Sequence, residues 1–143
     1  MASRRKGRIL AFQALYSWDL HNGETPSRTI PPGLLDFSWA VQTSPLAEET
    51  KAFSRLLVTG TVENIKVVDE MIQKHLVNWE IKRLNRVDLA IIRMSAYTLM
   101  FQTDMPPSIV IDEAVDISKE FGTDDSYRFV NGVLDSIRKT VSV

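Results

Sequence analysis

The hydrophobic pattern of the chain centres on residues 84–102, LNRVDLAIIRMSAYTLMFQ. Apolar residues of this segment occupy several sides of a helix, and a helix that is apolar nearly all round is buried in a core or a membrane. Charged and polar residues interrupt it, and no run reaches the roughly 18 uncharged apolar residues of a membrane span. The pattern therefore predicts the central helix of a soluble bundle.

Apolar steps of three and four residues predict the remaining helices. A first helix is expected over residues 4–21, and residues 47–78 continue the pattern. Gly60 is either a break between two helices or a mid-helix glycine, and the break is the favoured prediction. The next helix is expected to begin at Pro107 and to end at Gly122, and a last helix runs toward the end of the chain. The helix from Pro107 to Gly122 is predicted to bury one face, which consists of Ile111, Ala114, Val115, Ser118 and Phe121.

Residues 22–46 interrupt the helical pattern with four prolines. Proline prevents a long continuous helix, so this segment is predicted to be a loop, with one short helical turn within 34–39. No alternating strand pattern competes elsewhere. The expected fold is an all-α, single-domain bundle of about seven helices, short ones included, that spans residues 1–143.

Composition is consistent with an ordinary globular protein, at 44% hydrophobic and 24% charged residues. The chain contains no cysteine, which excludes disulfides, zinc–thiolate sites and a cysteine nucleophile. No apolar signal core follows the first residues. A cytoplasmic location is therefore expected, with no membrane association.

Catalytic chemistry has little support in the sequence. His21 and His75 each lack a second histidine or cysteine at metal-ligand spacing. Asp112 and Glu113 are adjacent near a predicted helix start, where acids interact favourably with the helix dipole, and adjacent helical residues point about 100° apart. The sequence thus predicts a protein that is not an enzyme, with no cofactor and no metal.

Positive charge is concentrated at the N-terminus although the net charge is −1. Four cations precede the first acidic residue, namely Arg4, Arg5, Lys6 and Arg8. Arginine pairs with phosphate oxygens through two parallel hydrogen bonds, so several such residues favour a polyanion. Lys6, Gln13 and Ser17 share a narrow polar stripe that extends this surface along the helix. The alternative is a disordered, solubilising tail.

Phe129 lies at the edge of the last helix's apolar stripe, about 90° from its centre. It shares its side with Asp125 and with Gly132, which lacks a side chain. An aromatic ring in this position can stack on an unpaired base. The alternative is that Phe129 packs beneath the N-terminal segment.

Three further residues allow two interpretations each. Tyr16 belongs either to the core or to an interface, because its spacing does not decide between them. Asp88 and Arg93 interrupt the central apolar helix, and an unpaired buried charge is costly. Each is therefore expected either at a partner-binding surface or satisfied internally.

The chain resembles the NusB family of bacterial transcription antitermination factors. The resemblance rests on ALYSW in the first helix, RVDLAIIR and AYTL in the central helix, IVIDEAVDISKEFG, and FGTDDSYRFVNGVLD near the end. It covers both ends of the chain, whereas residues 22–46 do not match and residues 47–78 match weakly. It implies a helical protein that binds the single-stranded boxA element of nascent ribosomal RNA. Such proteins act with NusE, a small-subunit ribosomal protein, and with other Nus factors on RNA polymerase to suppress termination.

By position, the resemblance implies two sets of site residues. The RNA-binding residues would be Arg4, Arg5, Lys6, Arg8, Gln13, Asp125 and Phe129. The NusE-binding residues would be Tyr16 and Asp88. Lys6 stands where the family usually has arginine, so its phosphate contact keeps the charge but loses the two-pronged geometry.

Two alternatives stay open from the sequence. One is a helical homodimer or protein–protein adaptor that does not bind RNA directly. The other is a module derived from the N-terminal, NusB-like domain of ribosomal RNA cytosine methyltransferases. The chain carries no cofactor-binding βαβ unit and no cysteine nucleophile, so it is not expected to methylate alone.

Overall fold

The computed structural model describes residues 3–22, 27–40 and 45–141 as a bundle of α-helices. The six α-helices are α1 (Arg4–Asn22), α2 (Glu48–Glu63), α3 (Ile65–Lys74), α4 (Arg86–Phe101), α5 (Pro107–Phe121) and α6 (Ser126–Val141). Two 3₁₀ turns, η1 (Leu34–Asp36) and η2 (Ile81–Arg83), lie in the connections. These described ranges contain no strand, which confirms the all-α prediction. Within the predicted loop, residues 23–26 and 41–44 lie outside the described residues.

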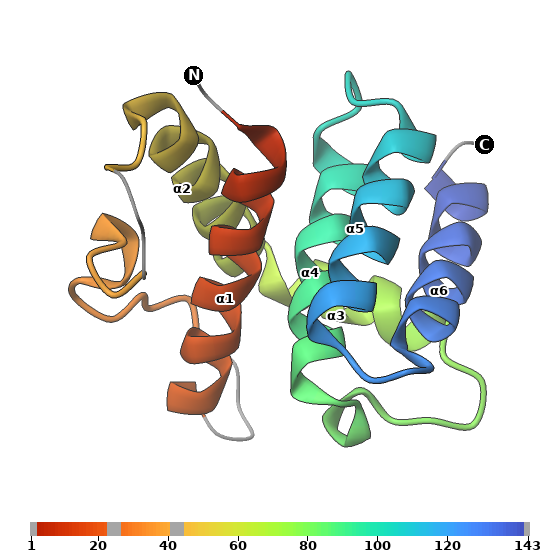
Figure 1. Cartoon of the computed structure of the whole chain (residues 1–143). Coiled ribbons are helices and arrows are strands. Elements are labelled where there is room, and N and C mark those ends of the chain that lie inside the picture. The colour runs from red at the N-terminus through yellow and green to blue at the C-terminus, as the bar shows by residue number, and fades with distance from the viewer. Residues whose placement is uncertain (1–2, 23–26, 41–44, 142–143) are drawn as a thin grey trace.

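Helix α4 is the centre of the bundle, as its sequence predicts. All residues from Asp88 to Leu99 are buried, and α4 contacts each of the other five α-helices. Asn85 caps its N-terminus, because the Asn85 side chain accepts hydrogen bonds from the backbone N–H groups of Val87 and Asp88. Figure 1 shows α1 and α2 on one side of α4 and α5 and α6 on the other.

Arg93 is one of the two charged residues of α4 for which the sequence allowed two interpretations. In the structure it is satisfied by internal ion pairs. Its Nε and Nη2 donate to the two carboxylate oxygens of Asp69 on α3, each at 2.9 Å. Its Nη1 donates to Asp19 on α1 at 3.2 Å. One buried guanidinium thus joins three helices, with all three of its nitrogens paired.

The predicted break at Gly60 is wrong. Helix α2 continues through Gly60 to Glu63, and the chain turns at Asn64 before α3 begins. Gly60 lies beneath Tyr97 of α4, where any Cβ would overlap the phenol ring. Glycine therefore serves a close helix–helix contact here instead of ending a helix.

The short turn predicted within 34–39 is present as η1. Leu34 and Phe37 are buried and fix this segment on the bundle, and Phe37 adopts a left-handed backbone conformation with φ of 58°. Across the described residues, no helix is long and apolar enough to cross a membrane.

Candidate nucleic-acid interface

The basic N-terminal segment forms the first turns of α1. Ser3 caps this helix, because its Oγ accepts from the Lys6 N–H at 3.1 Å and its carbonyl oxygen accepts from the Gly7 N–H at 3.0 Å. Ser54 on α2 donates to the Gly7 carbonyl oxygen at 2.7 Å, which holds the two helices together. The four cations are therefore presented by a helix and do not form a tail.

The cations differ in their surroundings. Arg4 is exposed, and its guanidinium lies 4.4 Å from the centre of the Phe53 ring. Arg8 also approaches this ring, at 5.4 Å, but it is only 6% exposed. Burial lowers the pKa of the Arg8 guanidinium. Arg8 consequently offers a phosphate much less surface than Arg4 or the half-buried Lys6 does.

Arg5 is engaged by two acids of α5. Its Nη2 lies 2.8 Å from Asp116 and 3.3 Å from Glu113. The hydrogen bond to Asp116, with the nearby charge of Glu113, raises the pKa of Arg5. Arg5 and Asp116 are both well exposed, so a phosphate can compete with these acids for the guanidinium.

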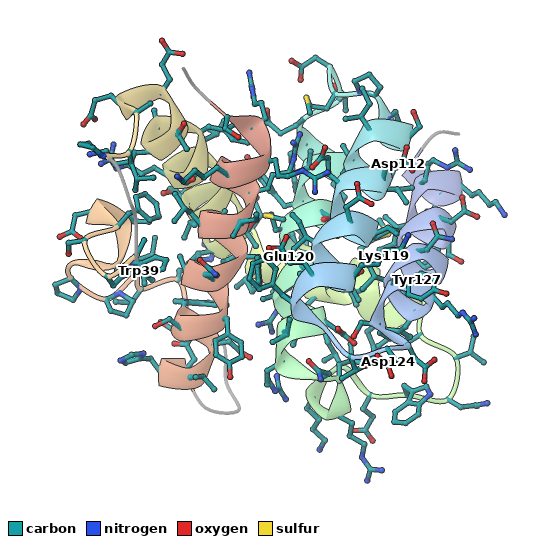
Figure 2. All side chains as sticks on the ribbon, viewed as in Figure 1. Trp39, Asp112, Lys119, Glu120, Asp124 and Tyr127 are labelled. Carbon is teal, nitrogen blue, oxygen red and sulfur yellow. The ribbon has the colours of Figure 1, made fainter. Side chains whose placement is uncertain are left out.

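A shallow trough of about 600 Å³ runs along the exposed side of α1. Lys6, Ile9 and Gln13 of α1 lie along it, Trp39 lies at one wall, and Glu120 and Phe121 of α5 lie at the other. Figure 2 shows Trp39 and Glu120 on the two sides of α1. We call this feature the α1 trough.

The α1 trough brings together three of the predicted RNA-binding residues, Arg5, Lys6 and Gln13. It also contains two exposed aromatic residues that the sequence did not assign to a site. Trp39 is 40% exposed, and Phe121, expected on a buried face, is 36% exposed. The expectation that Phe121 is buried is therefore wrong, although one side of its ring packs on Phe12, with ring centres 5.2 Å apart. The sequence signal that could have found them is the position of a large aromatic residue, within the predicted loop for Trp39 and at a predicted helix end for Phe121.

Asp125 and Phe129 lie apart from the α1 cations. Asp125 is exposed in the turn before α6, and Phe129 is half-buried against the core. Helix α6 lies on the far side of α5 from α1 and begins at the end of the bundle opposite the start of α1 (Figure 1). A nucleic acid that contacts both groups must therefore extend across α5.

The two predicted partner-binding residues are near the other end of α1. Tyr16 is half-buried on α1, and Asp88 is 7% exposed in the first turn of α4. The Asp88 Oδ1 atom has no hydrogen-bond partner among the described residues. Burial raises the pKa of Asp88, and Ser126 partly offsets this effect. The Asp88 carboxylate therefore differs from the Arg93 guanidinium, because it has no ion-pair partner among the described residues.

The histidines have local partners. His21 Nδ1 lies 2.9 Å from the Ser17 carbonyl oxygen, and His75 Nε2 lies 3.0 Å from the Thr140 hydroxyl. Neither belongs to a group of three potential metal ligands in the part of the chain that the structure describes. These contacts assign both histidines to local structure.

Comparison with known proteins identifies the family. The model of the NusB family matches residues 5–139. The chain belongs to the NusB family. Its members are non-enzymatic transcription antitermination factors. A transcription antitermination protein NusB from Treponema denticola is 52% identical over 135 residues, which cover 94% of this chain and 95% of the relative. The NusB of Treponema pallidum is 50% identical over 137 residues, at 96% and 93% coverage.

Solved NusB structures share the fold. NusB from T. maritima superimposes with a TM-score of 0.79 at 31% identity, over 97% of this chain and 93% of that one. An antitermination complex of NusB and NusE with double-stranded RNA includes a chain with a TM-score of 0.77 at 28% identity, at 96% coverage of both chains. The NusB resemblance noted in the sequence is therefore confirmed along nearly the whole chain.

Proposed function

We propose that this NusB-family protein binds the boxA element of nascent ribosomal RNA together with NusE. The complex then joins other Nus factors on RNA polymerase and suppresses termination, which places the protein in the cytoplasm. The support is its family and the solved relative in complex with NusE and RNA. The single observation that carries the proposal is the helical presentation of Arg5 and Lys6 in the α1 trough, with the exposed Arg4 in the same turn on the α2 side.

The proposed RNA contacts divide by chemistry. Arg4 and Lys6 bind phosphates, and Arg5 does so when a phosphate displaces the acids of α5. Gln13 lies in the α1 trough, where its amide can donate and accept hydrogen bonds. Asp125 and Phe129 contact the strand further along, beyond α5. We assign Arg8 a smaller direct role because it is buried.

NusE is proposed to dock near Tyr16 and Asp88. The support for this assignment is the family match, together with the solved relative that contains NusE. Tyr16 offers a half-buried ring whose hydroxyl can form a polar contact at an interface rim. RNA on the α1 side and NusE at this end would together form a composite complex.

The test is a fluorescence-anisotropy titration of boxA RNA with the protein, alone and with NusE. The wild type is compared with an Arg4→Ala/Arg5→Ala/Lys6→Ala variant, and circular dichroism checks that the variant folds. The expected result is salt-dependent binding that NusE strengthens and the variant loses. The same titration with double-stranded boxA RNA tests whether the protein prefers the single-stranded form, as we propose.

Two results would contradict the proposal. If NusE is captured but no RNA binds in any mixture, the protein is an adaptor and the α1 cations have another role. If light scattering shows a homodimer, and RNA neither binds this dimer nor converts it to monomers, the dimer is the functional form.

A further inference from the structure

The structure contains a base-sized aromatic site that the proposed phosphate contacts leave unused. Trp39 comes from the loop that does not match the family motifs, and it lines the α1 trough opposite Glu120 and Phe121. We infer that the α1 trough is a nucleobase subsite, in which one unpaired base of the bound RNA stacks on Trp39. This inference rests on the proposed RNA-binding function and adds a specific contact to it.

Trp39 is held in place although its ring is exposed. Its indole Nε1 donates to the Leu34 carbonyl oxygen at 2.9 Å. Its ring packs against Phe37, with ring centres 5.8 Å apart, and Phe37 is itself buried. A fixed ring loses little conformational entropy on binding, so this exposed surface is already arranged for stacking.

The chemistry of the trough favours a base beside a phosphate. Ile9 supplies apolar surface next to the indole, and the Gln13 amide can hydrogen-bond to the edge of a base. Lys6 lies in the same trough and can bind the phosphate that adjoins the stacked base. The charge and the aromatic surface therefore complement adjacent parts of one nucleotide.

Glu120 at the opposite wall further limits what the trough can bind. A carboxylate there repels a phosphate, so the backbone is directed toward Lys6 and the start of α1. The part of the nucleotide that enters the trough is then the uncharged base. Phe121 completes this wall and is itself fixed by Phe12.

The chain provides a matched control for Trp39. Trp79 is also exposed, at 55%, but it lies in the connection between α3 and α4 and is not among the residues of the α1 trough. Trp39→Ala and Trp79→Ala therefore remove the same side chain from two surfaces. Trp39→Tyr keeps an aromatic ring and should largely restore a stacking contact.

The experiment is an anisotropy titration of boxA RNA, with NusE present, against the wild type and these three variants. A set of RNAs that each carry one abasic position is titrated in parallel. Trp39→Ala is expected to weaken binding by about 5- to 150-fold, Trp79→Ala to leave it unchanged, and Trp39→Tyr to recover most of it. One abasic position should weaken wild-type binding by a similar factor and cause no further loss in Trp39→Ala.

The outcomes separate this inference from the proposed function. If Trp39→Ala is folded and binds RNA as the wild type does, while the α1 cation variant loses binding, the subsite is overturned and the proposed function stands. If Trp39→Ala and Trp79→Ala lose affinity equally, stacking on Trp39 is also overturned. If the wild type binds no RNA with or without NusE, both proposals fail. If Trp39→Ala loses NusE binding but not RNA binding, the trough is a protein contact and the inference is wrong.

Discussion

The Arg5 guanidinium donates a hydrogen bond to the Asp116 carboxylate at 2.8 Å, across the space between α1 and α5. One cation of the proposed RNA surface is therefore held by an acid of its own protein. RNA binding at Arg5 must exchange this ion pair for a phosphate contact. In the proposed function, the acids of α5 would therefore lower the affinity of the α1 cations for RNA.

Asp116→Asn is expected to strengthen RNA binding by roughly 2- to 5-fold, because exposed ion pairs contribute up to about 1 kcal/mol. Anisotropy titration at low salt measures the change. Glu70→Gln on α3 removes the same charge from a residue outside the α1 trough and is the control. Equal gains in both variants would mean that net charge, and not release of Arg5, sets the affinity.

Two glycines in helices are expected to respond oppositely to alanine. A Cβ at Gly60 would overlap Tyr97, so Gly60→Ala should lower the free energy of unfolding by about 1–3 kcal/mol. A Cβ at Gly132 meets no atom within 4 Å, so Gly132→Ala should raise it by about 0.5–1 kcal/mol. Urea denaturation of both variants measures these changes. A stabilised Gly60→Ala protein would contradict the close contact between α2 and α4.

Arg93 is expected to be essential for stability. Arg93→Met leaves the Asp69 carboxylate without its ion-pair partner and Asp19 with the half-exposed Arg86 alone, which should cost about 3–5 kcal/mol of unfolding free energy. Arg138→Met removes an exposed pair with Asp135 within α6 and should cost less than about 1 kcal/mol. Urea denaturation compares the two variants. Similar losses in both would show that the buried network does not join the helices as described.

Asp88 is expected to make stability depend on pH in a specific direction. Because burial raises the pKa of folded Asp88, the folded protein binds this proton more tightly than the unfolded chain. The resulting stabilisation is complete below the unfolded pKa of about 3.9 and is lost as the pH rises through the higher, folded pKa.

Asp88→Asn removes this titration. The variant should therefore be more stable than the wild type at neutral pH, with an advantage that shrinks as the pH falls through the raised, folded pKa and levels off below about 4. Denaturation curves of both proteins across this pH range give the difference. A difference that does not change with pH would contradict the raised pKa of Asp88.

The sequence predicted helices whose signal is local. Helix α4 was recognisable because its apolar residues surround the axis, and the N-terminus of α5 was recognisable because Pro107 suits a first turn. Gly60 was misinterpreted because its reason is Tyr97, a residue far along the chain that only the fold brings close. A glycine that ends a helix and one that admits a neighbouring helix look alike in sequence.

The interface was predictable in part for the same reason. The cations of α1 are consecutive in sequence, so their clustering is visible without a structure. The differences in exposure and pairing among these cations are not visible in the sequence, because Arg8 is buried beside Phe53 of α2 and Arg5 is paired with acids of α5. Trp39 escaped assignment because its position beside α1 depends on how the loop docks through Leu34 and Phe37.

The central claim is that α1 cations bind RNA phosphates, and the salt dependence of binding tests it most directly. The association constant for boxA RNA is measured with NusE at a series of salt concentrations, for the wild type and for Arg4→Ala/Lys6→Ala. Each phosphate contact of a single strand contributes about 0.7 to the slope of log K against log salt concentration. The account predicts a slope that is about 1.4 units shallower in the variant, with weaker binding at low salt. An unchanged slope and affinity in a folded variant would contradict it.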